Sequence, residues 1–246
     1  MKLTILGGHG TFPVPGGSCS GYLLEHEGFK LWMDAGNGTL GKLLQHWSFE
    51  DVDAIWISHA HADHAVDLYP FFYRMLGERG RRVPVLAPSG VPDRLASLIG
   101  ADSLPSWRSV FDWRGVDPGD RTEIGPFTLE GSGAQHTSPN TVLRISADDR
   151  TLTYTGDTGP IDTLSEAARG SDVFLCEASW VDPAQVFQPI HLLASQAGTY
   201  ARDAGVDRLI LTHVWAQNDR DRVHEEAAAA FGGDVSLAFE IDPIEV

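Results

Sequence analysis

The run from His59 to His64 places three imidazoles and a carboxylate within six residues, directly after an apolar segment that ends at Ser58. On extended backbone, residues i and i+2 point to the same side, so His59 and His61 can share one ion. Asp63 and His64 lie beyond the turn and can reach a second ion. Imidazole and carboxylate groups bind zinc, and manganese or iron at sites richer in oxygen. The run therefore predicts half of a two-metal site.

A binuclear site needs more ligands than one loop can supply, and later strands of this chain offer them. Three predicted strands each lead into one such residue: His136 after strand 127–131, Asp157 after strand 151–155, and His213 after strand 208–212. Asp157 lies at the tip of a glycine turn, which is a suitable place for a carboxylate that bridges two cations. We therefore expect these three residues to complete the metal site.

The motifs His-x-His-x-Asp-His, a lone downstream His, Thr-Gly-Asp-Thr and a late Leu-Thr-His together resemble the metallo-β-lactamase superfamily of metal-dependent hydrolases, over Leu3 to Phe239. The resemblance implies one ion bound by His59, His61 and His136, a second bound by Asp63, His64 and His213, and Asp157 between them. β-Lactamases of this superfamily usually have Cys where this chain has Asp157, which disfavours antibiotic hydrolysis. The cofactors implied are two divalent ions, Zn²⁺ in the first place and Mn²⁺ as the alternative.

Within the superfamily, the chain looks like the ribonuclease Z branch, which cleaves phosphodiesters. The segments that carry this resemblance are Leu175-Cys-Glu177-Ala-Ser-Trp180 and His191-Leu-Leu-Ala-Ser-Gln-Ala-Gly198. In that branch, the Glu after the strand and the His that opens the helix form a proton-handling pair, which implies the same role for Glu177 and His191. The alternative is that Glu177 only caps a strand end and that His191 is an ordinary residue of a first helical turn.

A phosphodiester is anionic and resists attack by hydroxide until its charge is neutralised. Two metal ions about 3.5 to 4 Å apart can hold a bridging hydroxide and polarise the phosphoryl oxygen. Asp63 could orient that hydroxide. His191, oriented by Glu177, would protonate the leaving alkoxide or stabilise the phosphoryl charge, a contribution of about 100-fold to 10,000-fold. This hypothesis assigns catalytic roles to all three side chains.

The charge of the chain bears on the size of the substrate, because a formal net charge of −16 repels a long nucleic acid. Ribonuclease Z relatives usually carry a Gly-Pro-rich arm for transfer RNA between the motifs of Asp157 and Glu177, and here we predict only a short helix. The sequence thus favours a small phosphodiester, such as a cyclic nucleotide, and resembles arm-less relatives of cyclic-nucleotide phosphodiesterases. The alternatives are a ribonuclease Z-like RNA endonuclease, a carboxyl-ester, lactone or thioester hydrolase, and a metal-binding protein without catalysis.

A length of 246 residues fits one hydrolase domain over residues 1–246, and no Pro, Gly or Ser tract suggests a linker. A strand is predicted almost at the first residue, and no apolar stretch approaches the roughly 20 residues that a membrane span needs. Cys19 and Cys176 lie far apart and are expected to be free thiols, as in a reducing cytosol. We therefore expect a cytoplasmic protein without membrane association, and the resemblance implies a homodimer.

The order of the predicted elements indicates two mixed β-sheets with helices on their outer faces, the αββα sandwich of the superfamily. Strands are predicted near 2–6, 21–26, 29–34, 54–58, 84–87, 110–116, 127–131, 141–147, 151–155, 173–176, 208–212 and 235–240. Helices are predicted near 38–46, from Asp63 through Leu76, and near 92–99, 161–168, 192–204 and 220–231.

A few conspicuous residues have no fixed role at this point. His9 lies in a glycine-rich turn, where a lone His is more often structural than catalytic. Trp107 and Trp113 could stack on a base or form a dimer surface, although such residues more often pack in a core. Trp215 and Gln217 follow a predicted ligand and are expected to line the substrate pocket.

Overall fold

The first seven-stranded sheet consists mainly of the N-terminal half of the chain. The computed structural model describes residues 1–78, 81–137, 139–186, 188–239 and 243–246. The strand order is β14 (Ile244–Glu245), β1 (Lys2–Gly7), β2 (Gly21–His26), β3 (Phe29–Met33), β4 (Ala54–Trp56), β5 (Val83–Ala87) and β6 (Phe111–Gly115). The strands β14 to β3 pair antiparallel, and β3 to β6 pair parallel, so this sheet is mixed.

The second seven-stranded sheet is built from the C-terminal half and is also mixed. Its order is β13 (Asp234–Leu237), β12 (Arg208–Thr212), β11 (Val173–Glu177), β10 (Arg150–Tyr154), β9 (Thr141–Ala147), β8 (Phe127–Gly133) and β7 (Arg121–Ile124). The strands β10 to β13 are parallel, whereas β7 to β10 are antiparallel. Parallel strands need crossover connections, and in this chain helices provide most of them.

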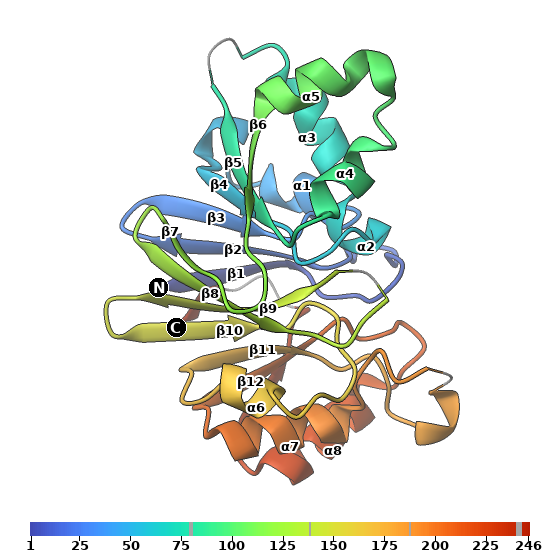
Figure 1. Ribbon diagram of the computed structural model, residues 1–246. Helices are drawn as coiled ribbons and strands as arrows, with labels where there is room; N and C mark the ends of the chain where they lie inside the picture. The colour runs from blue at the N-terminus through green and yellow to red at the C-terminus, as the bar shows by residue number, and fades with distance from the viewer. Residues whose placement is uncertain (79–80, 138, 187, 240–242) are drawn as a thin grey trace.

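Helices cover the outer face of each sheet (Figure 1). On the first sheet lie α1 (Thr39–Leu43), α2 (Ala62–Ala65), α3 (Leu68–Met75), α4 (Val91–Ala96) and α5 (Leu104–Val110), with two short 3-10 helices at Phe49–Asp51 and Ala101–Ser103. On the second lie α6 (Leu164–Ala167), α7 (Ala194–Ala204) and α8 (Arg220–Phe231), and a 3-10 helix spans Pro183–Gln185. The predicted αββα sandwich is therefore confirmed.

Three apolar clusters hold the layers together. One lies between the two sheets and includes Leu3, Tyr22 and Leu143, which are fully buried. The other two lie between each sheet and its helices, and Phe71 and Phe174 belong to them. Burying one such side chain fully contributes about 1.5 to 3 kcal/mol, so the sandwich provides a rigid base for the loops at its edge.

The predicted helices and strands differ from the observed ones at places where tertiary contacts determine the local structure. One helix was predicted from Asp63 through Leu76, but the structure has two, α2 and α3, and the Asp67 carboxylate between them accepts a hydrogen bond from the Leu40 N–H at 2.8 Å. The helix α5 and the strands β7 and β14 were not predicted, because they are short, and the two strands lie at sheet edges. Residue 240, the end of one predicted strand, lies outside the described residues.

Trp107 is 1% exposed and makes edge-to-face contacts with Phe72 and Phe111 in the helical layer of the first sheet, so it is a core residue. Trp113 is partly buried against the same cluster. The Trp107 ring is therefore not free to stack on a base. In the described part of the chain, no helix is both long and apolar enough to cross a membrane.

Candidate metal centre

Strand ends from both sheets bring polar side chains together at one edge of the sandwich. Asp34 follows β3, His59 is the third residue after β4, Asp157 is the third residue after β10, Glu177 ends β11 and His213 follows β12. Within each sheet these strands are parallel, so their carboxyl ends meet at the same edge. Functional residues commonly lie on loops at such edges because the sheets beneath fix their positions.

The seven predicted ligands fall into two neighbouring groups, each with donor atoms within 4.8 Å of one another. The first group is His59, His61, His136 and Asp157, and the second is Asp63, His64 and His213. In the first, His136 Nε2 lies 3.1 Å from His61 Nδ1. In the second, His213 Nε2 lies 3.1 Å from Asp63 Oδ2. The structure thus brings together the set that the resemblance implies, in the same partition.

Asp157 lies between the two groups and is 2% exposed. Its Oδ1 is 3.1 Å from His64 Nε2, on the side of the second group. Its Oδ2 is 3.6 Å from His59 Nε2 and 3.4 Å from His213 Nε2. A carboxylate with ligand nitrogens of both groups around it is placed to bridge two cations.

Most of these histidines have a hydrogen-bond partner outside the ligand cluster, here called an outer partner, on the Nδ1 atom of the ring. His64 Nδ1 lies 2.7 Å from Asp34 Oδ2, and His213 Nδ1 lies 2.7 Å from Ser179 Oγ. His59 Nδ1 lies 3.1 Å from Ser58 Oγ, and His136 Nδ1 lies 3.1 Å from the Ile190 carbonyl oxygen. In each case Nε2 is left for the centre. Metal-binding histidines almost always have such a partner on the second nitrogen.

Asp34 is part of this centre, although the sequence analysis did not single it out. It is fully buried and also accepts hydrogen bonds from the Ser58 N–H and hydroxyl, both at 2.7 Å, and from the Tyr154 hydroxyl at 2.6 Å. Its φ of 54° is uncommon for a residue other than glycine, as is the φ of 52° at His213. Such conformations cluster at functional sites. The available signal was an Asp directly after an apolar strand and before a glycine turn, the pattern that also marked Asp157.

The side chains of the centre fit divalent metal ions. Burial lowers the pKa of His59, His61 and His136 below 6.5, so these imidazoles are neutral at pH 7, the form that binds metal. Among the described residues, His59 Nε2 is buried without a hydrogen-bond partner, and His64 Nε2 and Asp157 Oδ1 lie 3.1 Å apart without forming a hydrogen bond. Buried polar atoms are rarely left unsatisfied unless an ion or water completes them. Nitrogen and carboxylate ligands in this proportion suit zinc.

Glu177 and His191 form a pair beside the centre. His191 Nδ1 lies 2.9 Å from Glu177 Oε1. The His191 ring stacks on that of His213, with centroids 5.2 Å apart. Burial lowers the pKa of His191, but the Glu177 carboxylate outweighs it and the pKa is raised to about 9. Asp157, His191 and His213 also have donor atoms within 4.8 Å of one another, so His191 reaches the edge of the ligand cluster.

Glu177 is fully buried and joins several parts of the site. Its Oε1 accepts a hydrogen bond from the Thr158 N–H at 2.7 Å, and its Oε2 accepts one from the Ser179 hydroxyl at 2.8 Å. Since Ser179 Oγ also contacts His213 Nδ1, one carboxylate orients both His191 and His213. Glu177 is therefore a positioning residue. Ser179 had no sequence signal, because its role depends on a contact with His213 after the neighbouring strand β12.

The N-terminal loop closes one side of the centre. The Thr11 N–H donates a hydrogen bond to Asp63 Oδ2 at 2.8 Å, and Thr11 has a φ of 67°. The backbone of His9 bridges to Val214, next to His213, and the His9 ring lies 4.6 Å from that of Phe239. Trp215 is half-buried, and its ring lies 4.3 Å from that of Trp180, while Gln217 is exposed.

Comparison with known proteins agrees with this geometry. Residues 30–214 match the Beta-lactamase superfamily domain. The chain belongs to the metallo-β-lactamase superfamily. It is thus a metal-dependent hydrolase by family, with a His and Asp cluster able to bind metal.

Sequence relatives cover nearly the whole chain. An uncharacterized protein of Mycobacterium bovis is 36% identical over 100% of this chain and 92% of the relative. The probable metallo-hydrolase YhfI of Bacillus subtilis is 26% identical over 97% of both chains. A ribonuclease Z of Methanopyrus kandleri is 29% identical over 94% of this chain and 93% of its own length.

Solved structures show the same fold. The crystal structure of YhfI from Bacillus subtilis superposes with a TM-score of 0.90 at 24% identity, over 100% of this chain and 98% of that chain. The short form of human tRNase Z gives a TM-score of 0.80 at 20% identity, over 100% and 99%. These likenesses establish the architecture.

Proposed function

We propose that this protein is a phosphodiesterase that binds two divalent ions, zinc in the first place, and cleaves a small phosphodiester such as a cyclic nucleotide. The observation that carries the proposal is the Glu177–His191 pair at the edge of the ligand cluster. Hydrolysis of an activated acyl ester does not need a proton donor of this kind, whereas an alkoxide leaving from phosphorus does.

The geometry of His191 suits it for proton transfer to a leaving group. Its Nδ1 faces Glu177, so Nε2 is the nitrogen left for a substrate, and its side chain is 10% exposed. In the proposed reaction a water oxygen forms a bond to phosphorus while the bond from phosphorus to the ribose oxygen breaks. His191 Nε2 donates its proton to that oxygen, and Glu177 holds the ring in place as the charge changes.

The metal ligands would supply the remaining chemistry. His59, His61 and His136 would hold one ion, Asp63, His64 and His213 the other, with Asp157 shared. Ions held by these residues would neutralise phosphoryl charge and activate water for attack. Asp63 is 14% exposed in its side chain and faces the cluster, so it could also orient the attacking water.

Charge and chain length support a small substrate. The formal net charge of −16 opposes the binding of a polyanion. Between Asp157 and Glu177 the structure has only the four-residue helix α6, with no projecting arm. Cleavage of precursor transfer RNA is a second candidate, and the observation in its favour is the relative named ribonuclease Z.

A panel of substrates tests the proposal. Protein loaded with zinc or manganese, and chelated protein, would be assayed on 3′,5′-cyclic AMP, an aryl phosphodiester, an aryl carboxylic ester and a precursor transfer RNA. We expect turnover of cyclic AMP and the aryl phosphodiester that chelation abolishes. Cleavage of the transfer RNA alone would support the second candidate, and turnover of the carboxylic ester alone would refute the phosphodiesterase proposal.

A further inference from the structure

Backbone strain gathers around the second group of ligands, Asp63, His64 and His213. Five described residues other than glycine have a positive φ, and two of them lie in the hairpin turns after β2 and β9. Of the other three, Thr11 has a φ of 67° and donates its N–H to Asp63. Asp34 has a φ of 54° and lies 2.7 Å from His64, and His213 itself has a φ of 52°. Such conformations persist only where the surrounding structure fixes them, so the second group depends on contacts that hold these positions.

One such contact crosses from the second sheet to the first. Tyr154 is the last residue of β10, and its hydroxyl donates a hydrogen bond to Asp34 Oδ2 at 2.6 Å. The same oxygen lies 2.7 Å from His64 Nδ1. Tyr154 is 1% exposed and Asp34 is fully buried, so bulk water cannot replace the hydroxyl. Tyr154 therefore helps to fix the carboxylate that orients His64.

A second tyrosine makes the reverse crossing, from the first sheet to the second. Tyr22 lies in β2 and is fully buried, and its hydroxyl shares a hydrogen bond of 2.5 Å with Thr212 Oγ1. Thr212 is the last residue of β12, and His213 follows it directly. The rings of Tyr22 and Tyr154 meet edge to face, with centroids 5.1 Å apart. The two hydroxyls thus join the sheets at two strand ends of the second group.

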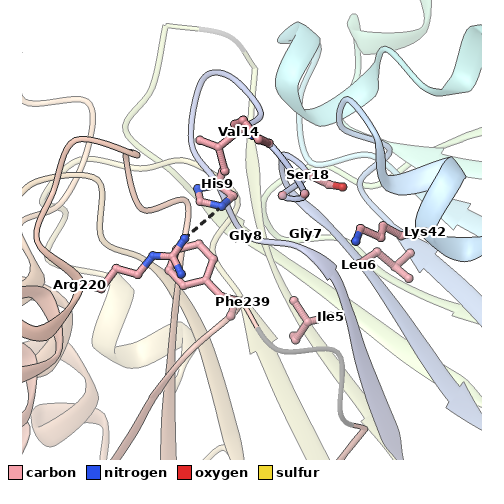
Figure 2. Close-up of a pocket in the computed structure, with 14 residues that line it drawn as sticks. Ile5, Leu6, Gly7, Gly8, His9, Val14, Ser18, Lys42, Arg220 and Phe239 are labelled. Atoms are coloured by element: carbon pink, nitrogen blue, oxygen red, sulfur yellow. Dashed lines mark hydrogen bonds between the residues drawn. The ribbon is translucent and has the colours of Figure 1, made fainter.

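The N-terminal loop supports the same group from another side. Figure 2 shows this loop, which runs from Gly8 to Val14. The Gly10 N–H donates to the Val214 carbonyl oxygen at 3.2 Å, and the Val214 N–H donates to the Gly8 carbonyl oxygen at 3.1 Å. A Cβ at Gly10 would lie 2.7 Å from the His213 carbonyl oxygen, so the loop can pass this closely only because Gly10 has no side chain. The loop is therefore anchored beside a ligand of the second group.

The histidines of the first group have other outer partners. His59 Nδ1 lies 3.1 Å from Ser58 Oγ, and His136 Nδ1 lies 3.1 Å from the Ile190 carbonyl oxygen. Ser58 donates to both oxygens of Asp34, and its N–H bonds Oδ1, the oxygen that the tyrosine hydroxyl does not contact. Loss of that hydroxyl should therefore leave Ser58 and His59 in place.

We propose that Tyr22 and Tyr154 are positioning residues for one ion only, the ion that Asp63, His64 and His213 would hold. The proposal rests on the proposed two-ion centre and does not depend on the identity of the substrate. Each hydroxyl holds a strand end of the opposite sheet next to a residue with positive φ, so its loss leaves His64 or His213 less firmly oriented. The two ion sites are thus unequal, because the second depends on hydrogen bonds between the sheets.

Titration of metal-free protein with zinc, in competition with a chromogenic chelator, measures both binding steps without any turnover. The variants are Tyr154→Phe and Tyr22→Phe, which keep the ring and remove the hydroxyl. The matched control is Tyr69→Phe, because the Tyr69 hydroxyl donates at 2.7 Å to the Leu95 carbonyl oxygen in the helical layer of the first sheet. Thermal unfolding confirms that each variant is folded, and either tyrosine variant provides the test if the other is not.

Two ligand variants assign the binding steps to the ligand groups. His213→Ala should abolish the step of the second group, and His136→Ala should abolish the step of the first. The step that changes in a tyrosine variant can then be matched to one group. A tyrosine that only stabilised the fold would not weaken one step and spare the other.

We expect wild type and Tyr69→Phe to bind two zinc ions with the same pair of affinities. Tyr154→Phe and Tyr22→Phe should weaken only the step that His213→Ala abolishes, by about 10-fold or more, as for the loss of an outer partner. Unchanged affinity in both variants, or equal weakening of both steps, would overturn the proposal and leave the two-ion centre intact. Binding of a single ion by wild type would overturn the two-ion centre and this proposal with it.

Discussion

Replacing Asp34 with Asn tests whether the partner behind His64 controls metal binding. The carboxylate accepts four hydrogen bonds: two from Ser58, one from His64 and one from Tyr154, all at 2.6 to 2.7 Å. Asn keeps one acceptor oxygen and puts an NH₂ group against donors. Hydrogen bonds to a charged group contribute about 1.5 to 3 kcal/mol each, and at least one is lost. We expect the free energy of unfolding of metal-free protein to fall by about 2 to 4 kcal/mol.

The same substitution should weaken metal binding. Without the carboxylate, the His64 ring is less basic and less firmly oriented, and loss of such a partner typically costs 10- to 100-fold in metal affinity. Competition with a chromogenic chelator measures the affinity, and urea denaturation measures stability. The control is Asp53→Asn, because Asp53 accepts one hydrogen bond, from the Lys30 N–H at 2.8 Å, away from the centre. A metal affinity of Asp34→Asn equal to that of the control would refute the reasoning.

Three further predictions follow from particular contacts. Gly156→Ala should lower the urea midpoint of unfolding more than Gly170→Ala does. Both glycines have positive φ, but only at Gly156 would a Cβ meet a side-chain oxygen, Asn140 Oδ1, at 2.7 Å. Equal midpoints for the two variants would contradict this prediction. Burial raises the pKa of Cys19 to about 12 and also raises that of Cys176, so neither thiol should react with a thiol reagent at pH 8 until urea unfolds the protein; rapid labelling of native protein would be evidence against it. Ser179→Ala should weaken metal binding by about 10-fold or more in the chelator assay, and unchanged affinity would remove its orienting role.

The sequence predicted which side chains cluster at one edge of the sandwich, because four of them follow apolar strands. His59, His136, Asp157 and His213 all stand where a regular hydrophobic pattern stops, and the pattern is local. The parallel strands β10 and β12 then bring Asp157 and His213 to the same edge of their sheet. The architecture of two sheets with helices outside was also predictable from local patterns, because the order of strands and helices along the chain indicates it.

The outer partners were not predicted, because their roles arise only in three dimensions. Ser179 contacts Glu177 two residues away but also His213, 34 residues away. Asp34 meets Tyr154 across 120 residues. The hydrophobic pattern along the sequence does not indicate which distant residues will contact each other. The break between α2 and α3 likewise depends on the contact of Asp67 with another helix.

In the proposed mechanism, His191 is the proton donor of a metal-dependent phosphodiesterase. The most direct measurement is the kcat of His191→Ala on 3′,5′-cyclic AMP, with bound metal determined on the same sample. The control is His26→Ala, because the His26 ring pairs with Asp148 at 3.0 Å, far from the ligands in the described structure. We predict that His191→Ala keeps its metal and loses about 100- to 10,000-fold in kcat, while His26→Ala keeps both. Full turnover by His191→Ala would contradict the account.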